Sequence, residues 1–150
     1  MSNEHEHRPP TKPDGDDGYF EKLTQTVFQT GFNWKVVRDK WGAFQEAFDG
    51  FDIDTVAEYD ARDLERLLAN DGIVRNARKI EATVDNARIM QRLIDEHGSF
   101  QGYLRSLDAL SWKERRKTLS KTFKYLGPTG VYFFLWSVAE EVPPWEERDR

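Results

Sequence analysis

The sequence predicts an all-α fold, and three observations support this prediction. Apolar residues recur at spacings of three and four along most of the chain, and no strand-like alternation is sustained. Capping residues and glycines separate these stretches at helix-length intervals. Hydrophobic residues make up 38% and aromatic residues 13% of the 150 residues, which suffices for the core of one domain.

The N-terminal segment differs from the rest of the chain in composition. Residues 1–18 are rich in proline, glycine and acidic residues, and they contain no apolar residue after Met1. Such a segment buries too little apolar surface to offset the entropy of ordering it. We therefore predict a disordered acidic arm over residues 1–18 and a helical domain over residues 19–150.

Helical periodicity begins at Tyr19, and Gly31 ends the first helix. In the first half of the chain we expect helices at about 19–30, 33–47, 55–58 and 61–70, with a loop at 49–54. Asp60 is the predicted N-cap of the fourth helix, because an aspartate there accepts hydrogen bonds from free backbone N–H groups.

In the second half we expect helices at about 76–97, 100–104 and 112–123, and a last helix from Thr129 or Gly130 to about residue 140. Ser99 and Ser111 are the predicted N-caps of the middle two, and Pro143-Pro144 prevents the last from continuing. Six aromatic residues fit the core better than a ligand site: Trp41, Phe44, Tyr132, Phe133, Phe134 and Trp136.

Several classes of function are excluded by what the sequence lacks. It has no cysteine, so disulfides, thiolate zinc sites and cysteine nucleophiles are ruled out. It has neither a glycine-rich nucleotide-binding loop nor a specific cluster of metal ligands, so we expect no cofactor and no metal. It also has no apolar run long enough for a transmembrane helix and no signal-peptide pattern, so we expect a cytoplasmic protein without membrane contact.

Charge is distributed unevenly along the chain. The formal net charge is −5, but residues 1–18 hold five acidic and two basic residues and so contribute −3. Six basic residues gather in one segment, opposed only by Glu114: Lys113, Arg115, Arg116, Lys117, Lys121 and Lys124. Since local fields steer phosphate more than the total charge does, this segment is a candidate for nucleic-acid contact. A solvated helix face is the alternative.

The segment Phe123–Gly130 has the pattern of a helix end, a tight turn and a helix start. Glycines permit unusual turn conformations and a close backbone approach, and a proline suits the first helical position. The N–H groups at the following helix N-terminus suit a phosphate oxygen. The predicted DNA-binding residues are Lys121, Lys124, Leu126, Gly127, Pro128, Thr129 and Gly130. An ordinary turn between helices is the alternative.

Three blocks of the sequence match one set of known motifs in the same order. Residues 31–37 (GFNWKVV) are similar to a Gly-Leu-Ser-Trp-x-x-Val block, and residues 72–80 (GIVRNARKI) to a Gly-Ile-Ile-Arg-…-Lys-Ile block. Residues 120–129 (SKTFKYLGPT) are similar to a Ser-Lys-…-Phe-Lys-Phe-Val-Gly-x-Thr block. With these blocks the chain resembles the DNA-3-methyladenine glycosylase I family, within the helix-hairpin-helix DNA glycosylase superfamily. The resemblance implies a helix-hairpin-helix glycosylase-like domain that acts on DNA.

The resemblance also implies which residues form the site. Trp34 takes the place of a pocket tryptophan that stacks on the base, and Gln29 is a candidate to bind the base edge. Thr26 takes the place of a pocket glutamate, which makes it the aligned catalytic position. Glu146, after Pro143-Pro144, is a second catalytic candidate because many superfamily members carry an acidic residue there. A core tryptophan, an exposed helix glutamine and a solvated tail are the alternatives for Trp34, Gln29 and Glu146.

The function implied is excision of alkylated purines such as 3-methyladenine, by hydrolysis of the N-glycosidic bond in base-excision repair. The partner implied is double-stranded DNA with a flipped damaged base, bound by a monomer. The family's structural zinc is held by cysteine and histidine, and a chain without cysteine cannot form that site. Two alternatives stay open: a DNA-binding protein of the same fold without catalysis, and an unrelated helical interaction module.

Overall fold

The computed structural model describes residues 10–150, and the regular secondary structure in this range is helical, as predicted. The helices are α2 (Asp16–Gln29), α3 (Trp34–Asp39), α4 (Trp41–Ala47), α5 (Ile53–Ala57), α6 (Ala61–Leu68), α7 (Ala77–His97), α8 (Phe100–Ser106), α9 (Trp112–Thr122) and α10 (Pro128–Ser137), with short 3₁₀ turns η1 (Asp49–Phe51) and η2 (Trp145–Glu147). None of these helices is both long and apolar enough to cross a membrane.

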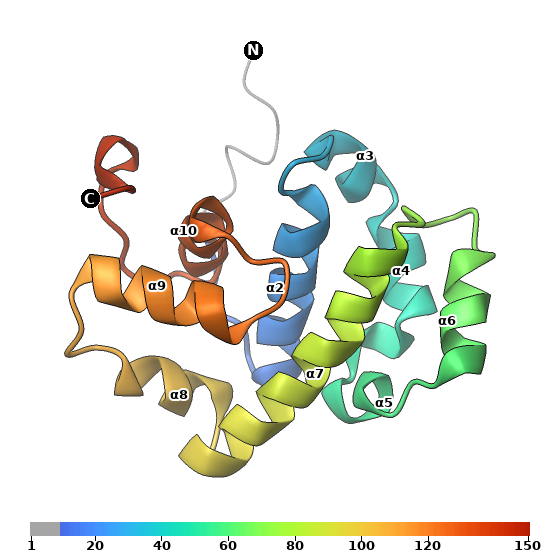
Figure 1. Ribbon diagram of the computed structural model, residues 1–150, viewed down its shortest axis with the longest axis horizontal. Helices are drawn as coiled ribbons and strands as arrows, with labels where there is room; N and C mark the ends of the chain where they lie inside the picture. Colours follow the sequence, from blue (N-terminus) through green and yellow to red (C-terminus); the bar gives the residue numbers. More distant parts are fainter. Residues whose placement is uncertain (1–9) are drawn as a thin grey trace.

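The long helix α7 runs through the middle of the molecule and organises the other helices (Figure 1). Its N-cap is Asn76, and Gly98 ends it in the left-handed region with φ 82°, so the predicted bounds 76–97 are confirmed. It packs against α2, α5, α6 and α8, while α10 packs against α2 and α9. Helices α3 to α6 therefore lie on one side of α7, and α8 and α9 lie on the other (Figure 1).

Helix α2 begins at Asp16, three residues before the predicted start at Tyr19. The carboxylate of Asp16 accepts a hydrogen bond from the backbone N–H of Phe100 at 2.8 Å, and that of Asp17 accepts one from Ile53 at 3.0 Å. These long-range contacts order the end of the segment expected to be a disordered arm. Residues 1–9 of that arm lie outside the described residues.

The predicted helix 33–47 is divided at Lys40 into α3 and α4. Lys40 has φ −95° and ψ 2°, which turns the chain between the two helices. The turn lets Trp41 stack on Phe51 at 5.2 Å between ring centroids and donate a hydrogen bond to the Glu21 carboxylate at 2.8 Å. Tertiary contacts of Trp41 therefore override the local helical pattern, because the period alone does not reveal them.

The predicted loop at 49–54 contains a left-handed turn followed by an early start of α5. Asp49, Gly50 and Phe51 have φ of 54°, 66° and 59°, a conformation that costs energy in the two residues with a Cβ. Asp52 then caps α5 at Ile53, two residues before the predicted start. Full burial of the Phe51 side chain offsets part of the strain.

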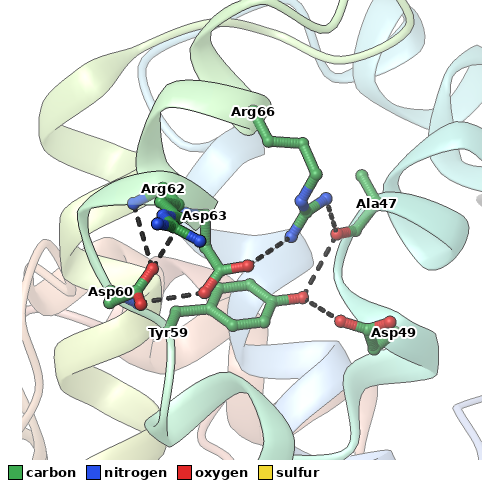
Figure 2. Close-up of polar contacts among 7 residues, drawn as sticks. All are labelled: Ala47, Asp49, Tyr59, Asp60, Arg62, Asp63 and Arg66. Carbon is green, nitrogen blue, oxygen red and sulfur yellow. Dashed lines mark hydrogen bonds and ion pairs between the residues drawn. The ribbon is translucent and has the colours of Figure 1, made fainter.

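A polar cluster around Tyr59 holds the left-handed turn in place (Figure 2). The Tyr59 hydroxyl contacts the Asp49 carboxylate at 2.5 Å and the Ala47 carbonyl at 3.2 Å, and Arg66 donates to the same carbonyl at 2.8 Å. The pKa of Tyr59 is raised far above its usual value. Burial of the hydroxyl is the main cause, and its hydrogen bond to Asp49 is the second. This hydroxyl therefore stays protonated and serves as a structural donor.

The aromatic core follows the prediction in part. Phe44 and Phe134 are fully buried and Tyr132 is buried, while Trp41 and Trp136 are half-buried. The expectation that Phe133 belongs to the core is wrong, since 45% of its surface is exposed. Phe133 follows two buried residues on α10, so helical geometry turns its side chain outward.

The C-terminal residues 140–150, here called the C-terminal strap, fold back on α9 and α10. Helix α10 ends at Ser137, three residues before the predicted end, and Ala139 has φ 63°. The Trp145 ring lies 5.3 Å from that of Phe133, and the Arg148 guanidinium lies 3.5 Å from the Trp145 centroid. The strap is thus an ordered part of the domain.

Candidate functional site

A stripe of buried polar side chains runs along α7. Lys79, Thr83 and Asn86 are spaced by four and three residues, so they lie on one face of the helix. Their exposed fractions are 9%, 1% and 1%. Buried polar groups need hydrogen-bond partners, and the partners of the two outer residues lie in two separate predicted site segments.

Lys79 binds the C-terminal end of α2. Its ammonium donates hydrogen bonds to the carbonyl oxygens of Phe28 and Thr30, each at 3.2 Å. A cation is favoured at a helix C-terminus, where the carbonyls lack partners within the helix. Burial lowers the pKa of Lys79, with no contribution from a neighbouring charge. Lys79 thus fixes the backbone on both sides of Gln29.

Thr26 and Gln29 lie one turn apart near the end of α2. The Thr26 hydroxyl donates a hydrogen bond to the Lys22 carbonyl at 2.9 Å, so its proton is already committed to the backbone. The Gln29 Nε2 atom is buried and has no hydrogen-bond partner among the described residues. An unpaired buried amide is costly, and a ligand that pairs with it gains that free energy. The two residues therefore share one face at the end of α2, and the Thr26 hydroxyl donates its proton to the backbone.

Trp34 begins α3 directly after the turn at Gly31, where φ is 75°. The Asn33 side chain caps α3 by accepting hydrogen bonds from the N–H groups of Lys35 and Val36. Trp34 is half-buried rather than fully in the core, and the Arg38 guanidinium lies 5.2 Å from its ring centroid.

Asn86 ties the turn between α9 and α10, residues 123–130 and here called the hairpin, to α7. Its amide donates to the Lys124 carbonyl at 3.1 Å and accepts from the Lys124 N–H at 2.8 Å. The next residue, Tyr125, has φ 57°, so the strained position of the turn falls on a tyrosine. The expectation that Gly127 and Gly130 supply the unusual turn conformation is wrong, because neither has a positive φ and Gly127 has φ −79°.

The N-terminus of α10 follows the hairpin and has the predicted form. Gly127 is the N-cap and Pro128 is the first helical residue, and no side chain caps the helix. The N–H groups of Thr129 and Gly130 thus have no side-chain partner at this end. Nothing lies within 4 Å of a Cβ built on Gly127, so the glycine leaves open space at this helix start, where Thr129 is exposed and Gly130 is buried. This arrangement suits one phosphate oxygen.

The hairpin and the end of α2 are neighbours. A Cβ built on Gly130 would lie 3.6 Å from the Thr30 hydroxyl and 3.0 Å from the Leu126 side chain. Leu126 is buried, so it supports the hairpin from inside rather than contacting a ligand directly. The glycine at position 130 is needed for close packing against α2. The start of α10 therefore lies beside Thr30, whose carbonyl oxygen accepts a hydrogen bond from Lys79.

The basic segment divides between two faces of α9. Arg115 and Arg116 point toward the C-terminal strap, where they donate to the carbonyls of Glu141 and Arg148. Lys113, Lys117 and Lys121 are exposed and lie four residues apart, so they form one row that leads to Lys124. Glu114 accepts hydrogen bonds from the Ser111 N–H and hydroxyl in a capping box, and is thereby held at the start of the helix.

Glu146 is exposed in η2, within the strap. The contacts of its neighbours Trp145 and Arg148 are with α9 and α10, whereas Thr26, Gln29 and Trp34 lie on α2 and α3. None of these contacts joins the strap to the residues predicted on α2 and α3. The catalytic role of Glu146 stays a prediction.

A surface cleft of about 390 Å³ opens at the other end of α2. Its lining is acidic and consists of Asp16, Asp17, Asp54 and Asp95 with Ile53, Gln91 and Ile94. These carboxylates repel phosphate, so the cleft is unsuited to DNA. Within residues 10–150, no group of three or more histidine and acidic side chains is arranged to hold a metal ion.

The sequence reasoning did not single out Lys79 and Asn86, whose side chains hold the end of α2 and the hairpin. With Thr83 between them, they form a polar set inside the apolar pattern of residues 76–97. That spacing was a usable signal, because a polar stripe beside an apolar one on a long helix indicates buried polar contacts. The spacing of residues on α7 does not predict the hydrogen-bond partners of these side chains, which lie at the end of α2 and in the hairpin.

The chain is similar to known proteins over most of its length. A family model described as methyladenine glycosylase matches residues 4–122. The DNA-3-methyladenine glycosylase of Haemophilus influenzae is 30% identical over 140 residues, which cover 79% of this chain and 75% of that protein.

Solved structures are similar over most of the chain. The 3-methyladenine DNA glycosylase I of Staphylococcus aureus superposes with a TM-score of 0.78 at 26% identity, covering 89% of this chain and 81% of that one. A variant of 3-methyladenine DNA glycosylase I in complex with 3-methyladenine has a TM-score of 0.78 at 25% identity, covering 93% and 88%. The match of family model, sequence and fold over most of the chain leads to one conclusion: this chain belongs to the methyladenine glycosylase family.

Proposed function

We propose that this protein is a DNA glycosylase that excises alkylated purines such as 3-methyladenine from double-stranded DNA in base-excision repair. The observation that carries the proposal is the polar stripe on α7. Through Lys79 it fixes the end of α2 beside Gln29, and through Asn86 it fixes the hairpin. One rigid helix thereby holds a base-recognition segment and a phosphate-binding segment next to each other.

The arrangement fits the steps that a glycosylase performs. The amides at the N-terminus of α10 bind a phosphate of the damaged strand. The damaged base leaves the stack and rests against Trp34, with Gln29 at its edge. Stacking on one aromatic face contributes about 1–3 kcal/mol per base. The Thr26 oxygen keeps its lone pairs, but its proton is bound to the Lys22 carbonyl, so it acts as an acceptor.

Cleavage of the glycosidic bond of an alkylated purine needs little general acid catalysis. A purine alkylated at a ring nitrogen is already positively charged, which weakens its bond to the sugar. The C1′–N bond breaks, its electron pair returns to the base, and the positive charge passes to the sugar. Water then adds to C1′ and releases a proton to solvent. Binding and orientation of the flipped base therefore supply most of what the reaction needs.

The test is release of base from methylated DNA. Purified protein incubated with a methylated duplex is expected to release free 3-methyladenine, detected by chromatography. Trp34→Ala should reduce the rate by about tenfold or more, as expected from the loss of one stacking contact. Release no faster from wild type than from Trp34→Ala contradicts the proposal. Salt-dependent duplex binding without any release would instead indicate a DNA-binding protein that lacks catalysis.

Gly127→Ala is expected to separate DNA binding from stability. The new Cβ meets nothing in the protein, and φ −79° suits alanine, so the free energy of unfolding should change by less than about 1 kcal/mol. Duplex affinity should fall by about fivefold or more, because the methyl group holds phosphate away from the amides. Urea unfolding and fluorescence anisotropy measure the two effects. Gly42→Ala, which also projects into open space, should leave affinity unchanged.

The lysine row on α9 is expected to contribute to DNA affinity through charge alone. Lys113→Gln with Lys117→Gln should lower the slope of log affinity against log salt by about 2, since each phosphate contact contributes about 0.9. A matched control removes two charges from other exposed sites, with Arg62→Gln and Arg92→Gln. An unchanged slope in the lysine variant would mean that the row is only a solvated face.

We also propose that the protein acts as a monomer in the cytoplasm, on a base flipped out of the duplex. The site is assembled by α2, α3, α7 and the hairpin of a single chain, so a second copy is not needed to complete it. Analytical ultracentrifugation with and without duplex DNA tests the stoichiometry.

A further inference from the structure

Two exposed aromatic side chains contact each other on the C-terminal side of the molecule. Phe133 on α10 and Trp145 in η2 are 45% and 42% exposed, and their ring centroids lie 5.3 Å apart. Phe32, Leu68 and Tyr125 are also exposed, but each lies in a different segment: the turn before α3, α6 and the hairpin. Exposed apolar side chains that gather in a patch mark interaction sites, whereas single ones are normal. Phe133 and Trp145, here called the aromatic pair, are therefore a candidate interaction surface.

The aromatic pair is held in place by its neighbours. The Tyr132 ring meets the Trp145 ring edge-on at 5.4 Å, and the Tyr132 hydroxyl donates a hydrogen bond to the Pro143 carbonyl at 2.9 Å. The Arg148 guanidinium lies 3.5 Å from the Trp145 centroid and donates to the Trp145 carbonyl at 2.8 Å. Rings that are already fixed lose little freedom on binding, so the aromatic pair is preorganised for a ligand.

The charge around the aromatic pair is negative. The strap holds five acidic and two basic residues, so its formal charge is −3. Glu140 pairs with Arg105, which leaves four exposed carboxylates without an ion pair among the described residues. These strap carboxylates are Glu141, Glu146, Glu147 and Asp149. Two of them share η2 with Trp145. Carboxylates in this number repel phosphate and attract a basic group.

The strap lies on the face of α9 that is away from the lysine row. Arg115 and Arg116 donate to strap carbonyls, whereas Lys113, Lys117 and Lys121 follow a different line along the helix. The strap contacts α9 and α10 and lies away from α3 to α6 (Figure 1). A ligand on the aromatic pair therefore leaves the lysine row free.

We propose that the aromatic pair and the strap carboxylates form a docking site for a basic segment of a partner protein, in which an arginine side chain stacks on the aromatic pair. A guanidinium is planar, stacks on aromatic faces and keeps its N–H donors for carboxylates. The Arg148 guanidinium on Trp145 is an example of this contact within the chain. The site takes no part in base release, so the proposal does not rest on the proposed function.

Binding of two basic peptides to the full chain tests the proposal. The probes are an arginine-glycine repeat and a lysine-glycine repeat of equal length and charge, titrated by calorimetry. Wild type is expected to bind the arginine peptide about threefold or more tightly than the lysine peptide. The reason is that a guanidinium stacks on a ring, whereas an ammonium is a compact and strongly hydrated charge. Equal affinities for the two peptides overturn the proposal.

Phe133→Leu removes one aromatic face and keeps an apolar side chain against Trp145. It should lower affinity for the arginine peptide by about threefold and bring the ratio of the two affinities closer to one. An unchanged ratio in folded Phe133→Leu overturns the proposal. The wild-type comparison needs no variant, so the test survives if Phe133→Leu fails to fold.

Glu147→Gln with Asp149→Asn should weaken both peptides by about threefold, because charge acts on both. The matched control is Asp54→Asn with Asp95→Asn, which removes two carboxylates from the acidic cleft at the other end of α2. This control should leave both affinities unchanged. An equal loss in the control means that peptide binding follows the net charge alone, and overturns the proposal.

Duplex DNA and a second copy of this chain are the competing occupants. Phe133 lies about one turn after Thr129 on α10, so DNA at the start of α10 is the nearer alternative. Phe133→Leu should leave duplex affinity, measured by fluorescence anisotropy, and the sedimentation coefficient unchanged. A fall in duplex affinity assigns the aromatic pair to DNA, and a dimer that Phe133→Leu abolishes assigns it to a second copy. Either result overturns the proposal, and neither depends on base release.

Discussion

Asn86→Leu is expected to lower the free energy of unfolding by about 2–4 kcal/mol and to weaken duplex binding by about tenfold or more. Leucine fills the space of Asn86, but it leaves the N–H and the carbonyl of Lys124 without their partners at 2.8 and 3.1 Å. Tyr125, with φ 57°, also loses the clamp that holds its strained backbone. The hairpin would then relax away from the end of α2. Urea unfolding and fluorescence anisotropy with a duplex measure both effects.

Thr83→Val is the matched control for Asn86→Leu. Thr83 is equally buried, at 1% exposed, and lies one turn earlier on the same face of α7. Its hydroxyl donates to the Lys79 carbonyl within the helix, so its loss should cost no more than about 1.5 kcal/mol and leave DNA affinity unchanged. If Asn86→Leu lowered stability but kept full duplex affinity, the clamp would not be what shapes the phosphate site.

Deletion of residues 141–150 is expected to lower the free energy of unfolding by about 2–4 kcal/mol. Trp112 and Tyr132 would lose their hydrogen bonds to the carbonyls of Arg148 and Pro143, at 2.8 and 2.9 Å. Arg115 would lose its bond to the Glu141 carbonyl, and Phe133 would lose the Trp145 ring. The strap thus closes the C-terminal side of a chain that cannot form a cysteine-containing zinc site. Thermal and urea unfolding of the truncated chain measure the loss.

Glu146→Gln is the control for the deletion of the strap. Glu146→Gln preserves the strap contacts of Trp145 and Arg148, so stability should change by less than about 0.5 kcal/mol. If Glu146→Gln also retained base release, the sequence-based prediction that Glu146 is catalytic would be wrong. A stability loss below about 1 kcal/mol on truncation would show that the strap rests on the domain without supporting it.

The site divides into parts that sequence could predict and parts that it could not. The candidates Thr26, Gln29 and Trp34 come from the resemblance around Gly31, and their role stays a prediction. The hairpin at 123–130 was also predicted, but its strain was assigned to glycines, whereas it falls on Tyr125. Turn conformation depends on what the turn is tied to, here Asn86, which lies 38 residues away in the sequence.

Local pattern alone determined the all-α class, most helix positions, the caps at Asp60, Ser99 and Ser111, and the family blocks. These follow from helical periodicity and from short-range hydrogen bonds, which act within a few residues. Only the tertiary structure decided the break at Lys40, the outward position of Phe133 and the partners of Lys79 and Asn86. These three features depend on contacts between segments that are far apart in the sequence. Whether a polar or apolar side chain is buried depends on which distant segment packs against it.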